Sequence, residues 1–139
     1  MHEYRIQRRV EFVDTDMGGI AHFSRFFVFM ENAEHALLNA LGTSVYVRQE
    51  EGKVLIWPRV ATSCEFLAPA RFEDVLDIHL KVLRKGTKSI TFGCEITRDG
   101  TPIARGQTTA VCCLFDPAGG IESIPLPSYI ADQLEEAPA

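Results

Sequence analysis

The sequence predicts an α+β fold in which one long antiparallel sheet curls around a single central helix. Two observations support this prediction: one strongly apolar helical pattern at about residues 24–41, and alternating apolar patterns through most of the chain that follows. A helix with so little polar surface must be enclosed on most sides, and a curling sheet would enclose it. The chain has 139 residues, so residues 1–139 are expected to form one domain.

Composition and charge argue against several classes of function. Hydrophobic residues make up 46% of the chain, and the net charge of −5 disfavours a general nucleic-acid binder. No apolar run is long enough to span a membrane, and the polar start MHEYRIQRRVEF is unlike a signal peptide. We therefore expect a reducing, cytoplasmic setting. The cysteines are then expected to be buried free thiols and not a zinc site: Cys64, Cys94, Cys112 and Cys113.

The first expected element is a half-buried strand at residues 4–13, in which apolar side chains from Tyr4 to Phe12 occupy alternate positions. Arg8 interrupts that apolar face once. The expected helix follows, with Ser24 as its N-cap and Gly42 as the residue just beyond its end. Its apolar positions recur at steps of three and four residues: Phe23, Phe26, Met30, Ala33, Leu37 and Leu41.

Long antiparallel strands are expected after the helix, at about residues 60–67, 75–85, 90–96 and 102–115. Asp99-Gly100 is a strong hairpin turn between the last two. Residues 43–57 are expected to be a loop with partial structure, and residues 128–137 a short terminal helix. No repeat or linker divides the chain, which favours a single sheet.

The stretch Asp14-Thr15-Asp16 lies just before Gly18-Gly19 and the expected helix start. The first N–H groups of a helix have no intrahelical partner, and they can polarise a carbonyl and hold a developing oxyanion. A neighbouring carboxylate can act as a nucleophile or as the general base for a water molecule. The glycines allow a thin substrate to pass close to the backbone. This combination suits acyl transfer, although aspartates before a helix also serve simply as turn and capping residues.

The segment DTDMGGIAHFSRFFVFMENA resembles the signature region of hotdog-fold acyl-CoA thioesterases of the 4-hydroxybenzoyl-CoA thioesterase and YbgC-like type. The segment EFLAPARFEDVLDIHLKVLRKGTKSITFGCEI resembles a strand pair and turn of the same family, so the resemblance covers nearly the whole chain. It implies a hotdog fold, an antiparallel five- to six-stranded sheet wrapped around one long central helix. It also implies thioester hydrolysis without a metal or other cofactor, because coenzyme A is part of the substrate.

Carried over by position, the resemblance makes Asp16 the catalytic aspartate and leaves Asp14 with a structural role. The thioester carbonyl would bind the backbone N–H of Phe23, at the helix start. His22 would be either a second catalytic group or a wall of the acyl pocket. Further contacts of the acyl thioester are expected from Gly18, Gly19 and Phe26.

The basic turn between the strands at 75–85 and 90–96 is the expected site for the phosphates of coenzyme A. Its members are Arg84, Lys85, Gly86, Lys88 and Ser89, and Arg59 is a weaker candidate. The family pairs its subunits into dimers and often into tetramers of two dimers, with sites at the dimer interface. The resemblance thus implies a homo-oligomer in which Asp16 of one chain meets Lys85 or Lys88 of another.

Several alternatives stay open at this point. The leaving thiol could belong to coenzyme A or to an acyl carrier protein, and the acyl group could be aromatic or fatty. A non-catalytic acyl-binding hotdog protein would share the fold, as would a dehydratase, which Ala21-His22-Phe23 faintly resembles. Glu31 and Glu34 could each face a pocket, but both are expected to face solvent or a neighbouring subunit.

Overall fold

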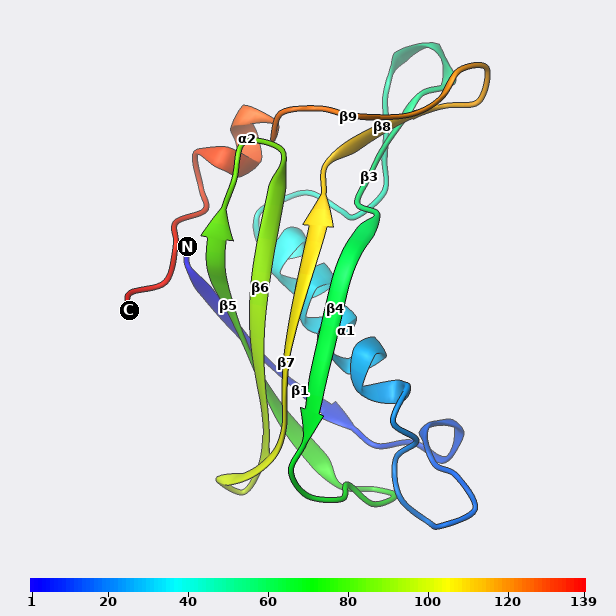
Figure 1. Cartoon of the computed structure of the whole chain (residues 1–139), viewed down its shortest axis with the longest axis vertical. Helices are drawn as coiled ribbons and strands as arrows, with labels where there is room; N and C mark the ends of the chain where they lie inside the picture. Colours follow the sequence, from blue (N-terminus) through cyan, green and yellow to red (C-terminus); the bar gives the residue numbers. More distant parts are fainter.

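The main sheet of the protein has five strands in the computed structural model, which describes residues 1–139. The strands are β1 (Glu3–Arg9), β4 (Arg59–Phe66), β5 (Val75–Lys85), β6 (Ser89–Arg98) and β7 (Thr101–Val111). Their order is β1-β5-β6-β7-β4, and every neighbouring pair is antiparallel. Helix α1 (Arg25–Ala40) runs along one face of this sheet (Figure 1). The predicted hotdog arrangement, one antiparallel sheet around one long helix, is confirmed.

Helix α1 supplies the centre of the core. Its bounds match the predicted span of 24–41 to within one residue at each end. Gly42 ends the helix as predicted, with φ of +84° and an N–H that donates to Asn39 O at 3.0 Å. The Thr43 N–H donates to Leu38 O at 3.0 Å, which completes a Schellman motif. The buried helix residues are Phe26, Phe29, Met30, Ala33, Glu34, Leu37 and Leu38.

The first strand is shorter than predicted. β1 ends at Arg9, and Phe12–Asp14 form a 3-10 turn, η1, where the sequence predicts a strand to residue 13. Phe12, predicted on the apolar face, is therefore 80% exposed. The cause is Asp14, whose buried carboxylate accepts the Glu11 N–H at 2.8 Å and closes the turn.

A second sheet lies beyond the end of β7, where the sequence predicts only a loop and a continuing strand. It contains β2 (Val47–Arg48), β3 (Val54–Ile56), β8 (Cys113–Asp116) and β9 (Gly120–Ser123), in the order β2-β3-β8-β9, with a 3-10 turn η2 (Glu50–Gly52) before β3. The strand predicted at 102–115 is thus two strands that separate at Cys112, whose N–H donates to Lys88 O at 2.7 Å. Helix α2 covers only Ser128–Ala131, where the sequence predicts a helix to residue 137.

Strand β4 forms one edge of the main sheet, because it pairs only with β7. Nearly all of its residues are exposed, and Cys64 alone is partly buried. A strand of this length with a free edge presents a row of unpaired N–H and C=O groups, which proteins usually cover or pair. The free edge of β4 is therefore the natural place for a further strand to pair.

The cysteines are free thiols, as predicted. Cys94, Cys112 and Cys113 are buried and Cys64 is partly buried, and none of them is in a disulfide. None of the helices combines the length and the apolar character that a membrane crossing requires.

Candidate active site

Residues 14–22 form a small hairpin that leads into α1. Its ladder consists of three backbone pairs: Asp14 with His22, Thr15 with Ala21, and Asp16 with Ile20. The Gly19 N–H donates to Asp16 O at 3.0 Å and closes the tip. Gly19 has φ of +78°, a conformation that residues with side chains rarely adopt. The hairpin therefore sets the register between Asp16 and the residues that begin α1.

The carboxylate of Asp16 stands exposed at this tip. Its Oδ1 accepts the Gly18 N–H at 2.8 Å, and no cationic side chain of the chain pairs with it. A Cβ added to Gly18 would lie 3.1 Å from Oδ1, closer than ordinary van der Waals contact. Gly18 and Gly19 thus shape the turn that carries Asp16, and the carboxylate keeps one oxygen free.

Asp14 lies only two residues earlier, but its environment is the opposite. Its side chain is fully buried and pairs with two arginines, Arg25 Nη2 at 2.6 Å and Arg8 Nη1 at 3.2 Å. Its backbone carbonyl accepts the His22 N–H at 2.8 Å. Arg8 also donates from Nε to Asn32 Oδ1 at 3.0 Å, which ties β1 to α1. Asp14 therefore anchors the hairpin to the strand and to the helix, and is a structural residue.

The backbone N–H of Phe23 has no hydrogen-bond acceptor within the chain, whereas the N–H groups of His22, Ser24 and Arg25 all have one. It is one of the free donors at the start of α1, where the helix dipole is positive. Ser24 does not act as the predicted N-cap, because its backbone is already helical and its side chain makes no capping bond. Ser24 Oγ instead bonds His22 Nδ1 at 2.8 Å, and the His22 ring stacks on Phe23 with centroids 4.6 Å apart.

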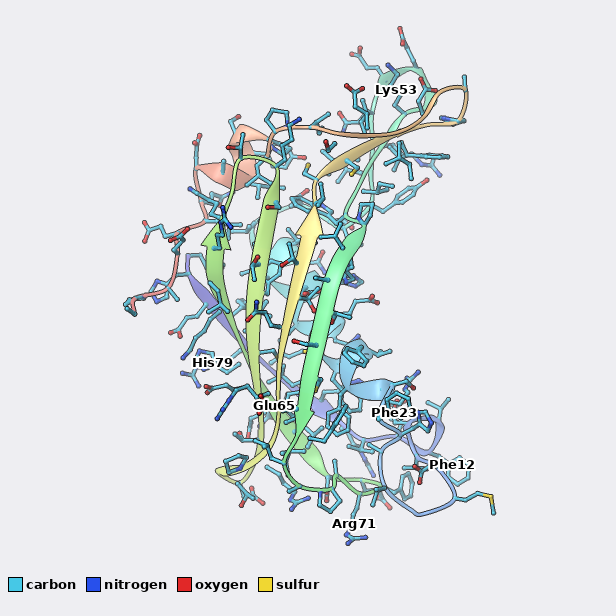
Figure 2. All side chains as sticks on the ribbon, in the orientation of Figure 1. Phe12, Phe23, Lys53, Glu65, Arg71 and His79 are labelled. Carbon is cyan, nitrogen blue, oxygen red and sulfur yellow. The ribbon has the colours of Figure 1, made fainter.

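An open apolar pocket of about 440 Å³ lies between this hairpin, the start of α1 and the end of β4. Asp16 is its one charged lining residue, and the others are Ile20, Ala21, Phe23, Phe26, Phe66, Leu67, Ala68, Pro69 and Ala70. Phe66 packs edge to face against two other phenylalanines: its centroid lies 5.4 Å from that of Phe26 and 6.5 Å from that of Phe23. Figure 2 shows Phe23 at the end of the molecule that also carries Phe12 and Arg71. The predicted Asp16, Phe23 and Phe26 therefore meet at one pocket.

The basic turn at residues 84–89 lies at the opposite end of the main sheet from the hairpin (Figure 1). Lys85 is not free there: its Nζ donates to Ala131 O and Leu134 O, both at 2.9 Å, and holds the C-terminal segment. Gly86 and Ser89 close the turn through a backbone bond of 2.8 Å. Arg84 and Lys88 are exposed and make no ion pair. One chain thus does not bring this turn to Asp16.

The expectation that the helix glutamates face solvent or a neighbouring subunit is wrong for Glu34, because this residue is only 3% exposed. It pairs with Arg59, whose guanidinium also donates to Trp57 O at 3.2 Å. Burial raises the pKa of Glu34 to about 7, although the charge of Arg59 acts in the other direction. Glu34 follows Met30 and precedes Leu38 by one helical turn each, so its position in the apolar stripe is the signal that sequence reasoning missed.

Comparison with known proteins gives a match to the family model of the thioesterase superfamily over residues 18–104. The 1,4-dihydroxy-2-naphthoyl-CoA hydrolase of Synechococcus elongatus is 25% identical over 135 residues, which cover 97% of each protein. The acyl-CoA thioester hydrolase YbgC of Escherichia coli is 26% identical over 110 residues, 78% of this chain and 81% of the relative. Among solved structures, a gentisyl-coenzyme A thioesterase aligns with a TM-score of 0.78 and 25% identity, covering 92% of this chain and 99% of its own.

Proposed function

The chain belongs to the thioesterase superfamily and is a thioester hydrolase, and we propose that it cleaves an aromatic acyl-CoA with Asp16 as the catalytic carboxylate. The observation that carries this proposal is that a carboxylate without a cation partner lies in the hairpin and a backbone N–H without an acceptor directly follows it. The first can attack or activate water, and the second can hold an oxyanion. Asp16 and Phe23 both line the same apolar pocket.

In the proposed reaction the thioester carbonyl oxygen accepts the Phe23 N–H, which polarises the carbonyl. Asp16 either attacks the acyl carbon and forms an anhydride that water then hydrolyses, or takes a proton from the water that attacks. In the general-base route the oxygen of water ends on the acyl group, and in the anhydride route it does so when water attacks the acyl carbon. In both routes a proton ends on the departing thiol. The products are a free acid and a thiol. His22, whose Nδ1 is engaged with Ser24, keeps its Nε2 for the substrate or solvent.

An aromatic acyl group is favoured by the three phenylalanines of the pocket. Aromatic rings prefer edge-to-face packing, as Phe66 shows with Phe23 and Phe26, and an aromatic acyl group can extend this cluster in the same geometry. Two similar proteins bear names with hydroxylated aromatic acyl groups, the 1,4-dihydroxy-2-naphthoyl-CoA hydrolase and the gentisyl-coenzyme A thioesterase. The alternative substrate is an acyl group bound to a carrier protein, and turnover of such a thioester in preference to the coenzyme A esters would favour it.

A homodimer joined through the free edges of β4 would supply the phosphate contacts that one chain lacks. Strand β5 has 11 residues, so the turn at its far end lies about 30 Å from the hairpin, beyond the reach of a single coenzyme A site in one chain. Arg84 and Lys88 of a second chain are the proposed phosphate contacts, and dimers could pair further into tetramers. Lys85 and Arg59 are weaker candidates, because both already hold partners in their own chain.

The direct test is the Asp16→Asn variant, measured with aromatic, short-chain and long-chain acyl-CoA esters and with an acyl carrier thioester. Asp16→Asn should lower kcat by about 100-fold or more, the scale of a lost catalytic base. Asp132→Asn, an exposed aspartate on the C-terminal segment, is the matched control and should retain full activity. Near-normal turnover by a folded Asp16→Asn protein would refute the assignment. Wild-type inactivity on every thioester would favour a non-catalytic acyl-binding protein.

A further inference from the structure

A second, smaller cavity lies about two helical turns along α1 from the acyl pocket. It is lined by α1, by the residues that lead into β4, and by β6 and β7, and its free volume is about 20 Å³. Its polar lining residues are Glu34, His35, Trp57 and Arg59, and Leu38, Ile90 and Phe92 are among its apolar ones. None of these residues lines the pocket that holds Asp16.

Two residues that line this cavity each carry a buried polar atom with no hydrogen-bond partner within the protein: Glu34 Oε1 and Trp57 Nε1. The two residues are only 3% and 6% exposed. Leaving a buried donor or acceptor unpaired costs about 1–3 kcal/mol, so two such atoms at one cavity require an explanation. The other Glu34 oxygen is already satisfied by Arg59, so the unpaired oxygen must find a partner elsewhere.

The chemistry of the two atoms defines the guest that would satisfy them. Trp57 Nε1–H can only donate, and Glu34 Oε1 accepts when the carboxylate is ionised. The guest must therefore accept one hydrogen bond and donate another. A cation is disfavoured by Arg59 and by the indole N–H, and an anion is disfavoured by the Glu34 carboxylate. A neutral hydroxylic molecule fits both groups.

Volume selects one hydroxylic molecule. A water requires roughly 10–15 Å³ of free volume and two or more polar partners, so the free volume of about 20 Å³ fits one water and is too small for two. We propose that this cavity is a binding site for a single buried water, which accepts a hydrogen bond from Trp57 Nε1–H and donates one to Glu34 Oε1.

The water site has a structural consequence for the acyl pocket. Glu34 belongs to α1, whereas Arg59 begins β4 and Trp57 lies two residues before it. The water and the Glu34–Arg59 pair therefore connect α1 to the start of β4. Phe26 of α1 and Phe66 at the other end of β4 both line the acyl pocket, and their rings pack edge to face. The water therefore helps to set the spacing between the helix and the strand that frame the substrate.

The proposal can be tested by NMR. The chain has one tryptophan, so the indole N–H of Trp57 gives a single signal that needs no further assignment. In the wild-type protein this signal should show a cross-relaxation peak with a long-lived water. Glu34→Leu removes the acceptor and should abolish the peak, while Glu31→Gln, one turn earlier on α1 and outside the cavity, should keep it. Absence of the peak in the folded wild type would overturn the proposal, and so would its persistence in a folded Glu34→Leu protein. Neither result depends on thioesterase activity.

Discussion

The buried carboxylate of Glu34 makes a measurable prediction about the pH dependence of stability. Burial raises its pKa to about 7, from 4.5 in an ordinary glutamate, because the charged form loses water and Arg59 compensates only in part. The folded protein then binds the Glu34 proton more tightly than the unfolded chain does. The contribution of Glu34 to stability is fully present below pH 4.5 and is lost as pH rises through about 7.

The size of the effect follows from the two pKa values. A pKa of about 7 in place of 4.5 corresponds to about 3 kcal/mol of unfolding free energy between the two pH limits. Little of this is lost to solvent screening, because Glu34 is only 3% exposed. Above pH 7 the ionised carboxylate remains paired with Arg59, so the curve should level off.

The assay is urea unfolding of the wild type and of Glu34→Gln at pH values from 4.5 to 8. The difference between the two proteins isolates Glu34 from other groups, and wild type should lose about 3 kcal/mol relative to Glu34→Gln across that range. The charged and titratable groups around it are Arg59 from β4, Glu31 and His35 on α1, and Cys94 from β6, whose thiol pKa burial raises to about 12. A difference that stays constant with pH would refute the reasoning.

Three other substitutions test separate parts of the structure. Asp14→Ala leaves Arg8 and Arg25 without their shared buried partner and should cost about 3 kcal/mol in urea unfolding, whereas a loss below about 1 kcal/mol would contradict the anchoring role. Gly106→Ala puts a Cβ 2.2 Å from Met30 Sδ and should cost about 1–3 kcal/mol, a cost that a Met30→Ala background should partly relieve. Lys85→Met should lower the Tm with little effect on KM, because Lys85 holds the C-terminal segment. Lys88→Met should leave the Tm unchanged and raise KM for a coenzyme A ester. The reverse pattern would contradict the roles argued for these two lysines.

The long elements could be predicted because local rules and tertiary packing agree in them. Helix α1 combines a wide apolar stripe with a glycine that closes it, and β5 to β7 alternate with clear turns between them. The break at Cys112 could not be predicted, because it depends on a hydrogen bond to Lys88, 24 residues earlier in the chain. Residues 113–116 read as a continuation of β7, and only tertiary pairing assigns them to the second sheet.

The environments of the charged residues in the site are harder to predict from sequence than the long elements are. The motif around Asp14 and Asp16 indicates where a carboxylate stands, but the burial of one and the exposure of the other depend on Arg8 and Arg25. Sequence alone predicts Glu34 at the surface, because glutamates rarely occupy a core and the arginine that pairs with it lies 25 residues further along the chain. Lys85 looks like a phosphate ligand in sequence because the carbonyls that bind it belong to a distant segment.

The hairpin at residues 14–22 explains why the spacing of the motif matters. The ladder pairs Asp14 with His22 and Asp16 with Ile20, so the exposed carboxylate and the Phe23 N–H lie at a separation fixed by backbone bonds and not by flexible side chains. Asp14 then ties the base of that ladder to two arginines, one from β1 and one from α1. An inserted residue between Asp16 and His22 would shift the register and turn alternate side chains to the other face. The two aspartates are therefore not redundant: the buried one holds the geometry in which the exposed one can act on a carbonyl bound at the helix start.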